Sequence, residues 1–273
     1  VNISASGKRI DLSNIKEKMQ KNPEKSEYIK LDLTSDIIKL NSKISLTGNL
    51  NGKIIDTSFK STGHGKIIMN GIPIMDNGKF KIQIDDKASS LEGLGLVGGA
   101  ETKINLSKRK NNFPSLIFDT SDGGKLLSVL GFTKNIKSGE MIININFLND
   151  DYNHYQGQIK SKKFSLINTP GIINSLSILS FSGISSIISG EGVFFDKGQA
   201  DINVKDKVFN FNKLYLTSES LGISAQGKLD LEKKSIDLKI IKERSLLSNK
   251  SWDKGIKTLD KNNLIEFIKE KKG

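Results

Sequence analysis

The sequence predicts a mainly β protein: a long, curved antiparallel sheet of meander and hairpin strands, groove-like in shape, with a few short helices. Three observations lead to this prediction. Apolar and polar residues alternate over most of the 273 residues, which is the period of a half-buried strand. The 25 glycines against 4 prolines are typical of many tight turns. Finally, the sequence contains no run of about 18 apolar residues that would form a membrane-spanning helix.

The chain is expected to open with a short strand, a turn and a helix of a few turns. In ISASGKRIDLSNIKEKMQKN, Asp11 or Ser13 can cap this helix. Ile15 and Met19 then lie four residues apart on one helical face. The following NPEKSE interrupts the helix.

From Ile29 onward the hydrophobic period changes to two, which predicts a meander of antiparallel strands with one apolar and one polar face. The segments GNLNGK and STGHGK are interpreted as turns between these strands. Asn77-Gly78 is interpreted as a hairpin signal. Residues 91–100, LEGLGLVGGA, are predicted to form a glycine-rich loop.

The segment DTSDGGKLLSVLGFTKNIKSGEMIININF, residues 119–147, predicts a turn, a short helix and a strand. Ser121 or Asp122 can cap the helix and Gly131 can end it, with the leucines between them on its buried side. Its Gly-Gly-Lys resembles a phosphate-binding loop. However, Lys125 is followed by leucine, so the spacing G-x-x-x-x-G-K-[ST] is absent.

One long apolar helix is predicted near 170–189, in NTPGIINSLSILSFSGISSIISGEG. Thr169 as N-cap and Pro170 in the first turn are a start signal. This helix can be buried under a sheet or face lipid. Its apolar positions are Ile172, Ile173, Leu176, Leu179, Ile184, Ile187 and Ile188.

Two regions are expected in the chain. Residues 1–241 form one continuous β-rich unit, with strands resuming near Ala200 and a hairpin in LDLEKKSIDL. Residues 242–273 form a polar, lysine-rich tail in which 260–271 can make a short amphipathic helix. The valine at position 1 and the lack of a signal peptide indicate a fragment of a longer polypeptide.

Motifs for catalysis, cofactors and metals are weak. Gly93-Leu-Gly95-Leu-Val-Gly98 matches the dinucleotide fingerprint, but an alternating strand pattern follows it instead of a helix. His64 and His154 are far apart in sequence, and there are no cysteines. Asp150-Asp151 near His154 is interpreted as a surface loop. We therefore expect no catalytic residues, no cofactor, no metal ion and no enzyme activity.

The formal net charge of +12 has two interpretations, a solvated surface or attraction to an acidic partner. The lysines are mostly dispersed, with short clusters at 108–110 and 160–163. Neither cluster is interleaved with aromatic residues, as a platform for stacking bases would be. No nucleic acid partner is expected.

The order of elements resembles a known family. FDTSDGGKLLSVLGFTKNIKSGEMIININF is similar to the core of the AsmA-like C-terminal region, as in YhdP-type members of the AsmA/TamB superfamily of bacterial envelope proteins. The run from GQIKSKKFSLINTPGII to LGISAQGKLDLEKKSIDLK and the N-terminal ASGKRIDLSNI resemble the same family. The resemblance spans about residues 1–240, and after Leu238 the sequence departs from it.

The resemblance implies a periplasmic β-groove, part of an inner-membrane-anchored protein of a Gram-negative bacterium. Such proteins are associated with phospholipid transport between the inner and outer membranes and with outer-membrane integrity. The implied partners are phospholipid or another membrane lipid and the remainder of the same polypeptide, including its membrane anchor. The candidate groove residues are Ile143, Ile145, Phe147, Ile202, Val204, Leu214, Leu216, Ile223 and Ala225.

Two alternatives remain open from the sequence. The first is a structural or scaffolding β-domain with a closed core, and the second is a basic anion-binding module. An open groove and a packed core require the same alternation of apolar residues. The sequence alone therefore does not separate them.

Overall fold

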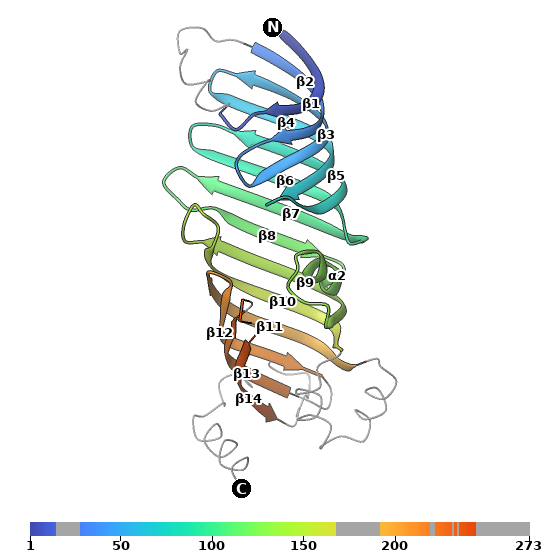
Figure 1. Cartoon of the computed structure of the whole chain (residues 1–273), viewed down its shortest axis with the longest axis vertical. Coiled ribbons are helices and arrows are strands. Elements are labelled where there is room, and N and C mark those ends of the chain that lie inside the picture. The colour runs from blue at the N-terminus through green and yellow to red at the C-terminus, as the bar shows by residue number, and fades with distance from the viewer. Residues whose placement is uncertain (15–27, 168–191, 219–221, 231, 234, 244–273) are drawn as a thin grey trace, which may run out of the picture.

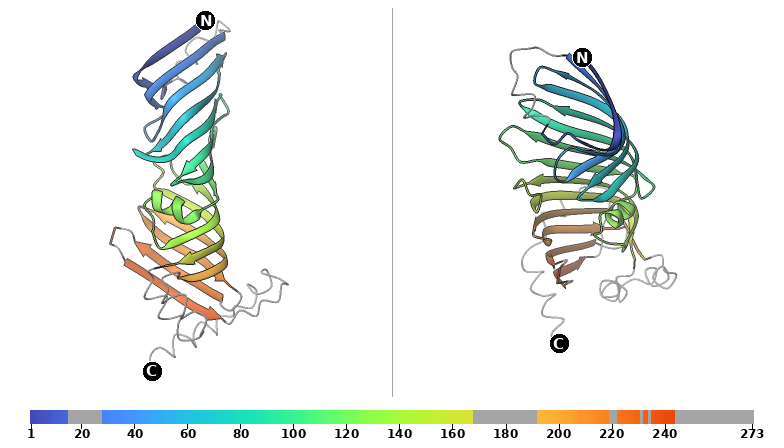
Figure 2. Two further views of the ribbon diagram at one scale, coloured as in Figure 1. Left: turned by 90° about the vertical axis from the view of Figure 1, so that its right-hand side faces the viewer. Right: turned by 45° about the horizontal axis from the view of Figure 1, so that its top comes forward.

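The fold is a single sheet of fourteen strands whose spatial order follows the sequence (Figure 1). A computed structural model describes residues 1–14, 28–167, 192–218, 222–230, 232–233 and 235–243. Figure 2 shows that the sheet is one layer, which twists along its length without curling strongly. The mainly β prediction is confirmed.

The strands are long, and one short helix, α2 (Gly123–Val129), lies between β8 and β9. The strand bounds are β1 Asn2–Asp11, β2 Tyr28–Lys39, β3 Ile44–Ile55, β4 Ser58–Met69, β5 Ile72–Ile84, β6 Ala88–Val97, β7 Ala100–Arg109, β8 Ser115–Thr120, β9 Ile136–Phe147, β10 His154–Leu166, β11 Val193–Lys205, β12 Val208–Thr217, β13 Gly222–Asp230 and β14 Ser235–Glu243.

Each strand pairs with the next one in sequence, and every pair is antiparallel except β1 with β2. A parallel pair needs a crossover of about a dozen residues or more, and residues 12–27 are long enough to provide it. The predicted helices near Ile15 and near 170–189 and the tail beyond 243 lie outside the described residues. Within the described part, no helix has the length and apolar character needed to cross a membrane.

Several predicted turns are wrong, because the chain uses their residues inside strands. GNLNGK lies in β3, STGHGK lies in β4, and most of the predicted loop 91–100 belongs to β6. Asn77 has φ 50° and lies with Gly78 at a register shift inside β5. These residues form a β-bulge, which inserts an extra residue without ending the strand. The hairpin turn before β5 is at Asn70-Gly71, both with positive φ.

One face of the sheet carries an unbroken apolar row from β1 to β13. Residues directly opposite each other in neighbouring strands point to the same face, so the pairing register can be followed across the sheet. One such row contains only apolar residues or glycine: Ala5, Leu33, Leu50, Gly63, Phe80, Gly93, Ile104, Phe118, Ile143, Ile159, Ala200, Leu214 and Ala225.

The opposite face is polar over the same length. A second row lies three residues from the first in every strand except β12, where the bulge between Phe211 and Leu214 makes the displacement four. This row contains no apolar side chain: Asn2, Lys30, Lys53, Lys60, Gln83, Ser90, Ser107, Ser115, Asn146, Gln156, Asn203, Asn210 and Lys228. We refer to these surfaces as the apolar face and the polar face. Their separation follows directly from the period of two in the sequence.

Side chains fill the apolar face unevenly. One large cluster of buried residues extends from Leu31 in β2 to Phe147 in β9 and includes Leu126 of α2. Beyond β9, the buried residues form two small clusters, one around Phe195 and the other around Val204. The N-terminal strands therefore carry a continuous core, whereas the C-terminal strands carry separate patches.

Candidate functional site: the apolar face of β9–β13

All of the groove residues predicted from the sequence lie on the apolar face. Three of the candidates belong to the apolar row itself: Ile143, Leu214 and Ala225. The other candidates lie an even number of residues from a member of the row in the same strand, or directly opposite such a position. For example, Phe147 lies opposite Tyr155, which in turn lies opposite Val204. The sheet thus brings the candidates together on one surface of β9–β13.

Their exposure separates the candidates into two groups. Ile143, Phe147, Ile202, Val204, Ile223 and Ala225 are buried. Ile145, Leu214 and Leu216 are only half-buried. Because these half-buried side chains lie among buried ones, they leave apolar surface accessible on the face where an apolar ligand would find its contacts.

The helix α2 lies against the start of β9, and its capping agrees with the prediction. The Asp122 carboxylate accepts a hydrogen bond from the Lys125 backbone N–H at 3.1 Å. At the other end, Gly131 has φ 75° and the Phe132 N–H donates to the Leu127 carbonyl at 2.9 Å. This hydrogen bond and the positive φ end the helix where the sequence predicts.

The Gly-Gly pair of this helix is required by close packing. A Cβ on Gly124 would lie 2.3 Å from the Ile136 carbonyl oxygen, and one on Gly123 would lie 2.5 Å from the Met141 side chain. Only glycine permits so close an approach of the helix to β9. Leu126 and Leu127 are buried as a result. Gly139 lies within β9 and has φ 90°.

An aromatic contact reaches across the apolar face. Phe132, in the segment between α2 and β9, packs edge-to-face on Phe209 of β12 with ring centroids 5.5 Å apart. β9 and β12 are three strands apart, which corresponds to about 14 Å within a sheet. The contact therefore lies over the apolar face of the intervening strands. Further ring contacts connect Phe209 through Tyr155 to Phe147.

Burial of Tyr155 in this aromatic group raises its pKa from 10.0 to about 12. A raised pKa means that the neutral phenol is favoured in the folded state. The neutral phenol of Tyr155 therefore contributes fully to the free energy of unfolding below pH 10, and this contribution is lost as the pH rises towards 12.

Between pH 10 and pH 12, we expect the free energy of unfolding to fall less in Tyr155→Phe than in the wild type, as measured by chemical denaturation at stepped pH. An equal loss in both proteins would contradict this assignment.

The other motifs lie in ordinary strands and loops. The glycines of the dinucleotide fingerprint lie in β6 and in the turn to β7, so no helix follows them. His64 lies on β4 and His154 begins β10, although both were predicted to be in turns or loops. Asp150 pairs with Lys108 at 2.6 Å. No group of three potential metal ligands occurs among the residues that the structure describes.

A hollow of about 640 Å³ lies on the polar face, where the sequence predicts no site. It crosses β6 to β11 and brings together side chains of Lys103, Lys160, Lys162 and Lys197. The cluster at 160–163 is visible in the sequence, but its neighbour Lys197 belongs to a different strand. The pairing of β10 with β11 brings Lys197 directly opposite Lys162.

Comparison of the chain with protein-family models, with curated proteins and with solved structures finds no match.

Proposed function

We propose that residues 1–241 are a non-enzymatic module of a bacterial envelope protein, part of a periplasmic β-groove that carries phospholipid between the inner and outer membranes. One observation supports this function above others: the unbroken apolar row on one face of a single-layered sheet. In this proposal, the groove is the apolar side that the twisted sheet presents to lipid. Its partners are a membrane lipid and the rest of the polypeptide, including an inner-membrane anchor.

The physical basis of the proposal is the contrast between the two faces. Transfer of an acyl chain from water to an apolar surface is favourable by about 0.8 kcal/mol for each CH₂ group that is buried. Half-buried side chains such as Ile145 and Leu214 offer apolar surface for this transfer. The polar face keeps the sheet soluble on the other side. Because the apolar row is unbroken across β9–β13, a chain bound at one of these strands can pass to the next without crossing a polar barrier.

The alternative is a structural β-domain with a closed core, and burial in the N-terminal strands favours it there. Leu46, Leu50, Phe59 and Ile67 are all 0% exposed. Such side chains leave no surface for an acyl chain. We therefore propose that lipid contacts are made over β9–β13, while β2–β8 serve mainly to hold the sheet together.

Co-purification of lipid tests the proposal. The full chain, purified without detergent from a Gram-negative host, is expected to yield phospholipid in an organic extract analysed by mass spectrometry. Leu214→Asp places a charge on the apolar face and should lower the bound lipid several-fold, since a carboxylate opposes transfer of the acyl chain. Lys213→Asp, at the neighbouring exposed position, should not. Phospholipid absent from the wild-type extract, or lowered equally by both changes, would count against the function.

A further inference from the structure

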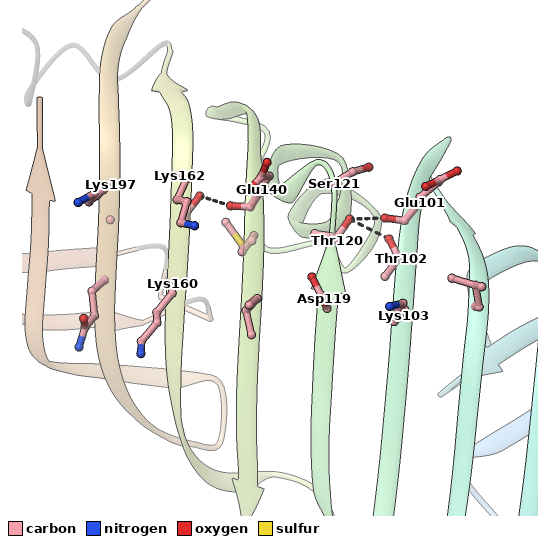
Figure 3. A pocket seen from close by; sticks show the side chains of 16 residues that line it. Glu101, Thr102, Lys103, Asp119, Thr120, Ser121, Glu140, Lys160, Lys162 and Lys197 are labelled. Atoms are coloured by element: carbon pink, nitrogen blue, oxygen red, sulfur yellow. Dashed lines mark hydrogen bonds between the residues drawn. The ribbon is translucent and has the colours of Figure 1, made fainter.

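The hollow on the polar face has an uneven distribution of charge. Figure 3 shows Lys160, Lys162 and Lys197 at one end, from β10 and β11. Glu101 and Asp119 lie towards the other end, with Glu140 between the two groups. Leu94 and Ile142, which are both exposed, provide apolar surface within it. Lys103 lies beside Asp119 at that other end. The hollow thus combines a basic end, an end with two carboxylates and one lysine, and a small apolar floor.

The three lysines have no anionic partner within 4 Å in the described part of the chain. Lys162 lies directly opposite Lys197 in the β10–β11 pair, so two like charges are neighbours across strands. Such a pair destabilises a sheet unless an anion lies between the charges. Lys160 lies two residues from Lys162 on the same face. Glu140 lies opposite Lys162 on the other side, yet no ion pair forms between them.

The acidic residues limit the kind of anion that fits. A nucleic acid strand carries a regular row of phosphates and would extend over Glu101, Asp119 and Glu140, which would repel it. A compact anion can lie at the basic end alone. Primary ammonium groups bind phosphate as point charges, without the fixed geometry of arginine. The chemistry of the basic end therefore suits a single phosphate group.

We propose that Lys160, Lys162 and Lys197 bind the phosphate group of a small phosphate ester, either free in solution or at the headgroup of a lipid. This site lies on the opposite face from the apolar surface of β9–β13 and does not depend on lipid transport. Two probes distinguish a free phosphate ester from a lipid headgroup. Glycerol phosphate represents the free ester, and vesicles of phosphatidylcholine with a minor fraction of phosphatidic acid represent the headgroup.

The sheet offers a matched control for this site. Lys53 and Lys60 are also directly opposite each other on the polar face, both exposed, but they do not line this hollow. The double variants Lys162→Ala/Lys197→Ala and Lys53→Ala/Lys60→Ala therefore remove the same charge from the same kind of lysine pair. Only the first pair belongs to the proposed site.

Binding of both probes to the full chain is measured at stepped salt concentrations. The change at Lys162 and Lys197 is expected to weaken binding of at least one probe by about tenfold or more. The change at Lys53 and Lys60 should weaken it by less than about threefold. Binding of glycerol phosphate assigns a free ester, and binding of the vesicles alone assigns a headgroup. If the wild type binds neither, or if both double variants lose binding equally, the site does not exist.

A second measurement needs no variant and so does not depend on how a variant folds. Phosphate bound at the site is expected to protect Lys160, Lys162 and Lys197 from chemical acetylation, followed by mass spectrometry of the full chain. Lys53 and Lys60 serve as unprotected references in the same molecule. Equal acetylation of all five lysines with and without phosphate would overturn the assignment.

Discussion

Replacing Ile143 by lysine should destabilise the protein by on the order of 4 kcal/mol, because it places an unpaired charge among buried apolar side chains. Ile143 is 4% exposed and belongs to the apolar row in the centre of the sheet. Its neighbour Ile142 is 41% exposed on the polar face. The same lysine at position 142 is expected to change the free energy of unfolding by less than about 0.5 kcal/mol.

Urea denaturation of the two variants measures this difference. The two substitutions are identical in chemistry and adjacent in sequence, so helix or strand propensity does not separate them. A similar loss at both positions would show that the two faces of β9 are equally accessible to water. That result would remove the distinction between an apolar and a polar face on which the proposed groove depends.

Phe195→Ala is expected to cost about 3 to 5 kcal/mol, the usual range for removing a buried aromatic ring. Phe195 in β11 is 0% exposed and stacks on Phe164 of β10, with ring centroids 5.6 Å apart. These rings are two of the three buried residues in their cluster. Since the C-terminal strands have only small clusters, few neighbouring side chains can move in to fill the cavity.

Phe194 provides the control for this prediction. It is 49% exposed on the opposite face, so Phe194→Ala should cost less than about 1 kcal/mol. Thermal unfolding of both variants, with the wild type alongside, gives the comparison. If Phe195→Ala were as mild as Phe194→Ala, the separate clusters beyond β9 would contribute little to the fold.

The sequence predicts the faces of this sheet well, because alternation is a local property of each strand. Ile143, Ile145 and Phe147 fall on one face whatever the register of the neighbouring strands. The capping of α2 is also local, and Asp122 and Gly131 are both found where the pattern places them. Such features need only the residues within one turn or one strand.

Turns and long-range contacts are harder to predict, for physical reasons. Asn77-Gly78 permits positive φ in a hairpin and in a bulge alike, so the dipeptide does not decide whether a strand ends. The polar hollow depends on Lys197 lying opposite Lys162, which is a matter of register. The contact of Phe132 with Phe209 depends on the twist of several strands. None of these is contained in a local pattern.

Photo-crosslinking shows whether lipid contacts the apolar face of β9–β13. A photoreactive amino acid is placed at Ile145 or at Asn144, which are adjacent, half-buried and on opposite faces. The full chain is irradiated in the envelope of a Gram-negative host, and phospholipid adducts are measured by mass spectrometry. Adducts are expected at position 145, with few or none at position 144. Equal adducts at both positions, or adducts only at 144, would contradict the proposed lipid contact.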